Sequence, residues 1–172
     1  MPGDSMAAAG PALPEGRFDG REAFADIVRA ALSSAARQGW RELVLSDPDF
    51  ADWPLGERAS VEALQAWSAT GRRFMLLAQR FDVVERSHAR FVPWRRMWDH
   101  IVECRVVVHA EAGSNAVPSA IWTPGWFAHR TDPERSRGLC GFDPRARREL
   151  RETIDESWRA GRPAFPASAL GL

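Results

Sequence analysis

The segment 43–45 is a short apolar run (LVL) that stops abruptly at a loop carrying Asp47, Asp49 and Asp52. A run of this length, bounded by turn residues, is typical of a strand that is buried on both faces. Such strands occur in sheets that helices cover on both sides, and ligands then bind outside the carboxyl ends of the strands. The run therefore predicts an α/β fold and nominates the aspartate loop as a place for function, without naming the function.

Helices and strands alternate along most of the chain. Helical spacing of apolar residues or helix-start signals are found over about 20–38, about 57–70, a segment that opens at Pro93, and about 144–160. Apolar runs predict strands at about 40–46, 72–78 and 105–110, and a hairpin that pairs 120–122 with 126–128. Helical crossovers between short strands favour parallel pairing, whereas a hairpin is antiparallel. We therefore expect a mixed, mostly parallel sheet flanked by helices.

The ends of these elements carry recognisable signals. Asp19 is expected to cap the first helix and Gly39 to stop it, while Asp143 is expected to cap the last helix. The segments 79–89 and 130–141 are polar or charged and are expected to be surface loops. Residues 1–16 have the composition of a disordered tail, which leaves 17–172 as a single α/β domain.

The basic chemistry of the chain is unusual because all 23 basic residues are arginine and none is lysine. This excludes a phosphate-loop lysine, a Schiff-base lysine and a lysine general base. The 23 basic residues are balanced by 23 acidic ones, so the net charge implies no bulk attraction to nucleic acid or to an anionic membrane. On this ground nucleic acid and membrane are not the expected partners.

The two cysteines, Cys104 and Cys140, lie far apart and outside any metal-binding spacing. A small secreted domain would normally use more of them in a disulfide framework. They are therefore interpreted as free thiols of a cytoplasmic protein, and no apolar run is long enough to span a membrane.

The aspartate loop allows two interpretations. Asp47, Asp49 and Asp52 offer the oxygen ligands that Mg²⁺ prefers, or they cap turns through their side chains. His109 and Glu111 are two residues apart on a predicted strand, which would place both side chains on one face as a histidine–carboxylate pair. These five residues form the candidate ligand-binding set, and no residue is assigned as catalytic.

The order of elements resembles one half of the phospholipase D-like fold, especially short bacterial domains of that fold. The resemblance is carried by an opening helix over 21–37 and by the segments LSDPDFADW, RRFMLLA, HIVECRVVV, AIWTPGWFAH and ESWRAGRPAFPASALGL. Members of that family carry the motif HxKxxxxD, whose positions would fall here on Val117, Ser119 and Pro124. None of these residues can serve, so the resemblance implies the fold and a two-fold dimer without the hydrolase activity.

Together these features favour a non-catalytic, degenerate phospholipase D-like domain that binds a protein partner or, through arginine, a phosphate-bearing ligand. One alternative is a Mg²⁺-dependent phosphohydrolase that uses Asp47 and Asp49. Another is a nucleic-acid-binding domain in which the segment 94–96 (WRR) and Trp126 stack on bases. No cofactor is expected for the main interpretation, and a homodimer is expected from the resemblance.

Overall fold

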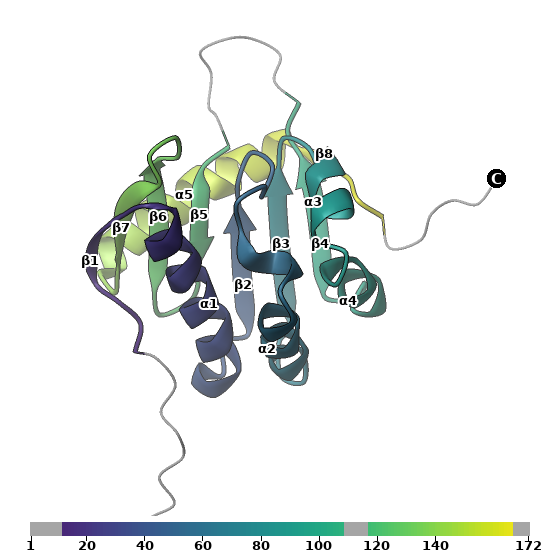
Figure 1. Ribbon diagram of the computed structural model, residues 1–172. Coiled ribbons are helices and arrows are strands. Elements are labelled where there is room, and N and C mark those ends of the chain that lie inside the picture. The colour runs from purple at the N-terminus through teal and green to yellow at the C-terminus, as the bar shows by residue number, and fades with distance from the viewer. Residues whose placement is uncertain (1–11, 109–116, 167–172) are drawn as a thin grey trace, which may run out of the picture.

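The computed structural model describes residues 12–108 and 117–166, which form one eight-stranded sheet with helices on both faces (Figure 1). The helices are α1 (Arg21–Gln38), α2 (Arg58–Ser68), α3 (Asp82–Ser87), α4 (Phe91–Met97) and α5 (Pro144–Ala160), with a short 3₁₀ turn η1 (Pro54–Gly56). The strands are β1 (Gly16–Asp19), β2 (Glu42–Ser46), β3 (Arg73–Ala78), β4 (Val102–Val106), β5 (Ser119–Trp122), β6 (Phe127–Asp132), β7 (Arg137–Gly141) and β8 (Arg162–Pro163). Within these ranges no helix is both long and apolar enough to cross a membrane.

The strands follow the order β1-β7-β6-β5-β2-β3-β4-β8. Only β2–β3 and β3–β4 pair in parallel, and every other neighbouring pair is antiparallel. The α/β class and the mixed sheet are confirmed, but the prediction of a mostly parallel sheet is wrong. The prediction failed in the region after β4, where short turns instead of helices join β5, β6 and β7. Such short connections permit only antiparallel pairing.

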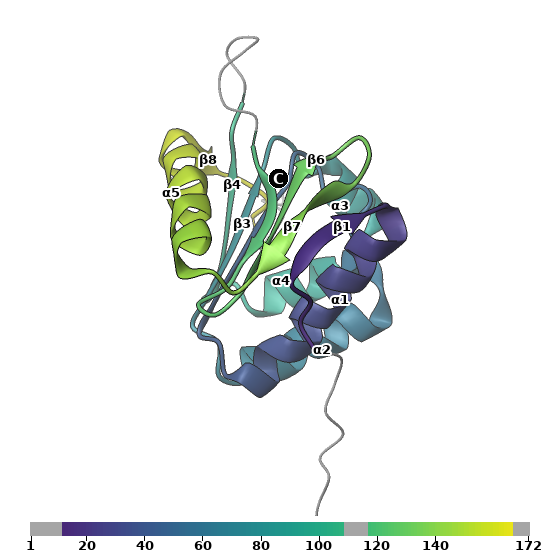
Figure 2. The same ribbon diagram turned by 90° about the vertical axis from the view of Figure 1, so that its left-hand side faces the viewer.

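The helices divide unequally between the two faces of the sheet. Helices α1, α2 and α4 pack on one face, and α5 runs along the other (Figures 1 and 2). The first face carries the larger apolar cluster, which includes the fully buried Phe24, Phe74 and Trp67. Nε1 of Trp67 donates a hydrogen bond of 2.6 Å to the backbone oxygen of Trp40. The cluster under α5 is smaller and consists of Leu150, Ile154 and Trp158 against side chains of the central strands.

Helix ends match the predicted signals in part. Gly39 adopts a left-handed φ of 64° and ends α1, and Asp143 accepts a hydrogen bond of 3.1 Å from the backbone of Ala146 at the start of α5. Asp19 does not cap α1, because it belongs to β1 and Gly20 occupies the cap position without a side-chain hydrogen bond. The capping prediction for Asp19 is therefore wrong.

Several short elements lie where loops were expected. Helix α3 falls within 79–89, and β7 falls within 130–141. β4 also lies earlier than the predicted strand at 105–110, which places Cys104 inside it. Both cysteines are free, as predicted, and the structure buries both. Burial raises the pKa of Cys104 to about 12 and that of Cys140 to about 11.

Candidate functional site

The first of the predicted aspartates, Asp47, stabilises the turn that follows β2. Its Oδ2 accepts hydrogen bonds from the backbone nitrogens of Phe50 (2.8 Å) and Asp49 (3.2 Å). Phe50 has a φ of 58°, a left-handed conformation that a bulky residue rarely adopts without support. His88 adds to this support, since its Nε2 lies 2.8 Å from the backbone oxygen of Phe50. The turn-capping interpretation thus describes Asp47.

The charge of Asp47 is neutralised by Arg130, which reaches it from β6 on the same face of the sheet as α1. Nη2 of Arg130 lies 2.9 Å from Oδ1 of Asp47, and Nη1 donates to Asp52. Nε donates to the hydroxyl of Ser119 at 2.9 Å, and the guanidinium lies 4.2 Å from the centre of the Phe24 ring. Burial by itself lowers the pKa of Arg130, but the hydrogen bond to Asp52 and the charge of Asp47 raise it above its ordinary value.

Asp49 belongs to a different set of contacts. Its Oδ1 accepts a hydrogen bond of 3.0 Å from the backbone of Ala51, and its Oδ2 lies 3.1 Å from Nη2 of Arg80 on the surface. Asp47 and Asp49 therefore diverge as turn caps instead of converging on one exposed point. Among residues 12–108 and 117–166 no group of three or more His, Cys, Asp or Glu side chains is placed to hold a metal ion.

Of the other sequence candidates, only the predicted stacking residues belong to the described part of the chain. His109 and Glu111 lie outside the described residues. Trp94 and Trp126 are 3% and 0% exposed, so neither offers a ring for stacking on a base. Arg95, a further member of the predicted stacking surface, is also buried. It donates hydrogen bonds to Asp99 and to the backbone oxygen of Phe165. The predicted stacking surface is therefore wrong, because these side chains are used in the core.

A second candidate lies on the α5 side of β1, β7 and β6. Arg17 pairs with Leu139, Leu139 with His129, and His129 with Ala120 across successive strands. Residues opposite one another in antiparallel strands share a face of the sheet, and Ala120 belongs to the cluster under α5. The whole row therefore faces the α5 side. The cluster under α5 includes no residue of β1 or β7, so this end of the sheet face is open to solvent.

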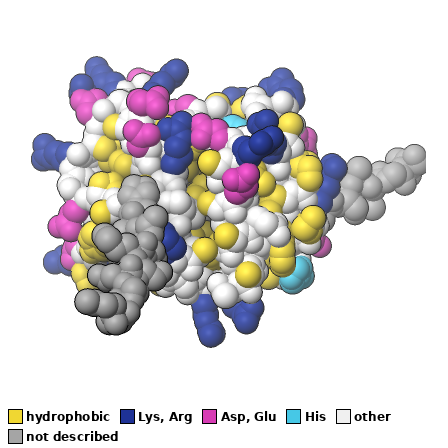
Figure 3. All heavy atoms as spheres, turned by 60° about the horizontal axis from the view of Figure 1, so that its bottom comes forward, with side chains coloured by type: hydrophobic (Ala, Val, Ile, Leu, Met, Phe, Trp, Pro, Cys, Tyr) yellow, Lys and Arg dark blue, Asp and Glu magenta, His cyan; other side chains and the backbone are white. Residues whose placement is uncertain are grey.

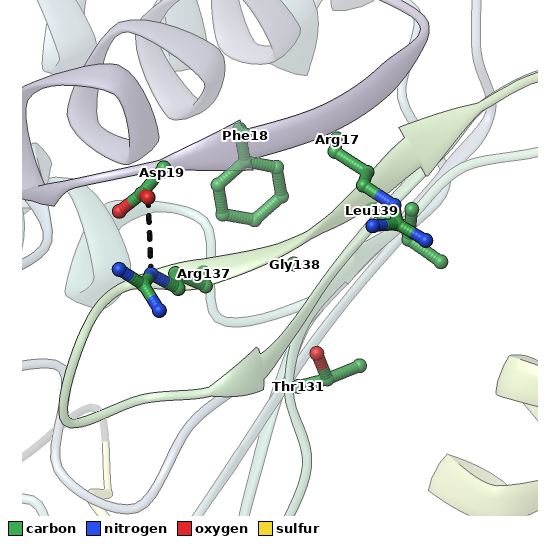
Figure 4. Close-up of a pocket in the computed structure, with 7 residues that line it drawn as sticks. All are labelled: Arg17, Phe18, Asp19, Thr131, Arg137, Gly138 and Leu139. Carbon is green, nitrogen blue, oxygen red and sulfur yellow. Dashed lines mark ion pairs between the residues drawn. The ribbon is translucent and has the colours of Figure 1, made fainter.

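The open end contains a groove of about 610 Å³, which we call the β1–β7 groove; it is lined by Arg17, Phe18, Asp19, Thr131, Arg137, Gly138 and Leu139 (Figure 4). Nε of Arg137 lies 3.0 Å from Oδ2 of Asp19, and both side chains are more than half exposed. Arg17 is exposed and has no carboxylate partner in the described part of the chain. Two guanidinium groups and one carboxylate leave the groove with one net positive charge.

The floor of the groove depends on Gly138. A Cβ at this position would lie 2.0 Å from the backbone oxygen of His129 and 2.7 Å from Cζ of Phe18. The pairing of β6 with β7 also shifts register between His129 and Asp132, which is a bulge. Glycine is required here because the two strands approach too closely for any side chain.

The helical end of the molecule differs from the β1–β7 groove in its distribution of charged side chains. Seen from below, it shows mainly hydrophobic and uncharged atoms, with basic and acidic side chains mixed along the rim and in the upper middle of the view (Figure 3). The visible described residues form no continuous basic stripe on this side. A basic site is thus better placed at the β1–β7 groove.

Sequence reasoning missed both the partner of the aspartates and the groove. Alternation in β6 places Ala128 and Arg130 on the same face, and a buried arginine needs a carboxylate. The segments GRFD and RGLCG also alternate: Phe18 is buried between exposed neighbours, and Leu139 is exposed between buried Gly138 and Cys140. Both segments are short and contain glycine and charged residues, which are rare in strands. For this reason neither segment was predicted to be a strand.

Comparison with known proteins gives a fold but no family. Neither the known protein families nor the curated proteins contain a match. A solved structure of TrmBL2, described as an archaeal chromatin protein with a novel mode of DNA binding, is similar with a TM-score of 0.62 and 14% identity. The match covers 92% of this chain and 57% of that one, so this chain spans little more than half of the similar protein. The similarity shows a shared α/β fold.

This finding corrects two expectations from the sequence. The function in the main interpretation, a non-catalytic domain that binds a protein partner or a phosphate-bearing ligand, is wrong, because the similar structure is described as that of a DNA-binding chromatin protein. The phospholipase D-like topology is not tested by this finding. The same finding contradicts the view that nucleic acid is not an expected partner. That expectation was based on the neutral net charge. Net charge is a sum over the whole protein and does not give the local charge of a groove.

Proposed function

We propose that this protein binds nucleic acid, with DNA as the first candidate, through the β1–β7 groove. The observation that carries the proposal is Arg17, an exposed arginine without a described carboxylate partner, beside a second arginine on an open sheet face. The guanidinium of arginine is planar and always charged, and its paired donors match phosphate oxygens. Contacts of this kind supply most of the affinity in sequence-independent binding.

Arg137 is available for the same purpose. Its ion pair with Asp19 is exposed, with side-chain exposures of 53% and 66%. Exposed pairs of this kind contribute about 0–1 kcal/mol, so an incoming phosphate can displace the carboxylate at little cost. Arg17 and Arg137 are diagonal neighbours on paired strands, a relationship that places Cα atoms about 7–8 Å apart. Two long side chains at this spacing can reach successive phosphates of one strand.

The comparison supports the proposal at the level of fold. TrmBL2 is described as binding DNA, and the alignment with it covers most of this chain. Its DNA contacts are a property of that protein, and the residues argued for here come from this chain alone. Because the groove carries one net positive charge, we expect modest affinity that weakens as salt increases.

Fluorescence anisotropy with a labelled oligonucleotide tests the proposal. Two phosphate contacts on duplex DNA predict a slope of about −1.8 for log affinity against log salt, hence a loss of about tenfold between 50 and 200 mM. Arg17→Ala and Arg137→Ala are each expected to weaken binding and to reduce the slope by about 0.9. Arg58→Ala is the matched control, because Arg58 is an exposed arginine at the start of α2, on the other side of the sheet.

Two results would overturn the proposal: no binding to any nucleic acid at low salt, or equal effects of the groove variants and the control. The phospholipase D-like resemblance is a separate proposal about topology alone. It stays a prediction, and structural superposition on members of that fold tests it: a different strand order would end it.

A further inference from the structure

We infer that the β1–β7 groove takes a single strand of nucleic acid in preference to a duplex. This inference rests on the proposed function and adds the form of the ligand. It starts from Leu139, a residue that is 46% exposed although β7 is paired with a strand on each side. Leu139 is directly opposite Arg17, and it is two residues from Arg137 on the same strand and face.

The groove thus combines charged and apolar parts. Figure 4 shows Arg17 next to Leu139 and Arg137 next to Asp19, with the Phe18 ring between these pairs. Phosphates of a duplex lie on its outer surface, and the flat faces of its bases are stacked inside. An apolar floor between two phosphate-binding arginines would gain nothing from a duplex. An unstacked base can cover Leu139 while its flanking phosphates reach the arginines.

Size and charge point the same way. A volume of about 610 Å³ falls within the range of sites that enclose a small molecule, which suits one or two nucleotides. Duplex binding without base contacts relies on the release of many counterions, and the groove offers only two guanidinium groups. Apolar contact with a base has to supply the remaining affinity.

Thr131 completes the arrangement. It is exposed on β6 and lines the groove from the side opposite β1. Its hydroxyl can donate and accept a hydrogen bond, so it suits the edge of a base or a sugar oxygen more than it suits a phosphate alone. In this arrangement the arginines contact phosphates, Leu139 contacts the base, and the Thr131 hydroxyl contacts the sugar or the edge of the base.

The test compares a labelled single strand with the duplex of the same sequence, both measured by anisotropy on the full chain. The single strand is expected to bind at least about fivefold more tightly, with a salt slope of about −1.4 for two phosphate contacts. Leu139→Ser is expected to weaken the single strand about fivefold and to leave duplex binding within twofold. Met97→Ser is the control, because Met97 is 66% exposed on α4, away from the groove.

The outcomes separate the two proposals. If duplex binds as tightly as single strand and Arg17→Ala weakens both, the single-strand inference fails and nucleic-acid binding stands. If Leu139→Ser acts no more strongly than Met97→Ser, the apolar floor is not a base contact and the inference fails. If neither form of DNA binds at low salt, and the RNA strand of the same sequence does not bind either, both proposals fail. Circular dichroism on each variant excludes loss of fold as the cause.

Discussion

Arg130 and Asp47 form a buried ion pair between β6 and the end of β2, with Nη2 2.9 Å from Oδ1. Their side chains are 3% and 2% exposed, so neither charge has solvent to compensate for the loss of the other. Asp47, which follows β2 and was predicted to bind a ligand, instead links the end of β2 to β6 through Arg130. Removal of Arg130 would leave Asp47 as an uncompensated charge in the interior, whereas Arg130 without Asp47 would still be paired with Asp52.

We expect Arg130→Met to lower the free energy of unfolding by about 3–5 kcal/mol, since it leaves Asp47 buried without its cation. Urea denaturation measures the change. The control is Arg80→Ala, which breaks the exposed pair with Asp49 and is expected to cost less than about 1 kcal/mol. Similar losses in the two variants would show that the buried pair has no special role.

Addition of Mg²⁺ is expected to leave the thermal unfolding temperature unchanged. Oxygens of Asp47 and Asp52 already accept from Arg130, and Asp49 faces Arg80. A ligand present at 100 times its Kd would stabilise the fold by about 2.7 kcal/mol, which a melting curve detects readily. A rise in melting temperature with Mg²⁺ that Asp49→Asn abolishes would restore the metal-binding interpretation of the loop.

Replacement of Gly138 by alanine should strongly destabilise the sheet, by about 3 kcal/mol or more. The new Cβ would lie 2.0 Å from the backbone oxygen of His129, so β6 and β7 would have to separate. Gly125→Ala is the control, because its Cβ meets only Nε1 of Trp40 at an ordinary 3.5 Å. Thermal melts compare the two, and equal stability would mean that β7 tolerates a shift away from β6.

Stability should fall as pH decreases below about 6.5, in part because of His129. Burial lowers the pKa of His129 from its ordinary value of 6.5, so the unfolded chain takes up its proton at a higher pH than the folded protein does. The unfolded state then binds more protons, and the free energy of unfolding decreases until pH falls below the folded pKa. Urea titrations at about pH 7.5 and about pH 5 should show a smaller decrease in His129→Gln than in the unaltered protein. An equal decrease in both proteins would contradict this assignment.

Long elements with a clear apolar stripe were predictable from the sequence. The predicted helices at about 20–38, 57–70 and 144–160 correspond to α1, α2 and α5 within about two residues at either end. Their periodicity extends over several turns, so a single misleading residue cannot hide it. The buried parallel strands β2 and β3 were found for the same reason, because their apolar runs are continuous.

Short elements and long-range pairings were not predictable in this way. β1 and β7 are four and five residues long; on the face that α5 leaves open, β1 exposes Arg17 and Asp19 and β7 exposes Arg137. Nothing local in GRFD indicates that it pairs with a segment more than a hundred residues away. The prediction of a ligand site failed for a similar reason. The three aspartates are evident in the sequence, but Arg130, which forms ion pairs with two of them, comes from a distant strand.

The pairing of Gly16 with Cys140 has a consequence for the timing of assembly. During synthesis, β1 leaves the ribosome early but has no partner until the chain through β7 has emerged. Contacts between such distant parts of a chain form slowly, because a large loop must close first. The groove and its Arg17 thus cannot be completed before β7 has emerged, and a polypeptide that stops before β7 lacks one wall of the groove.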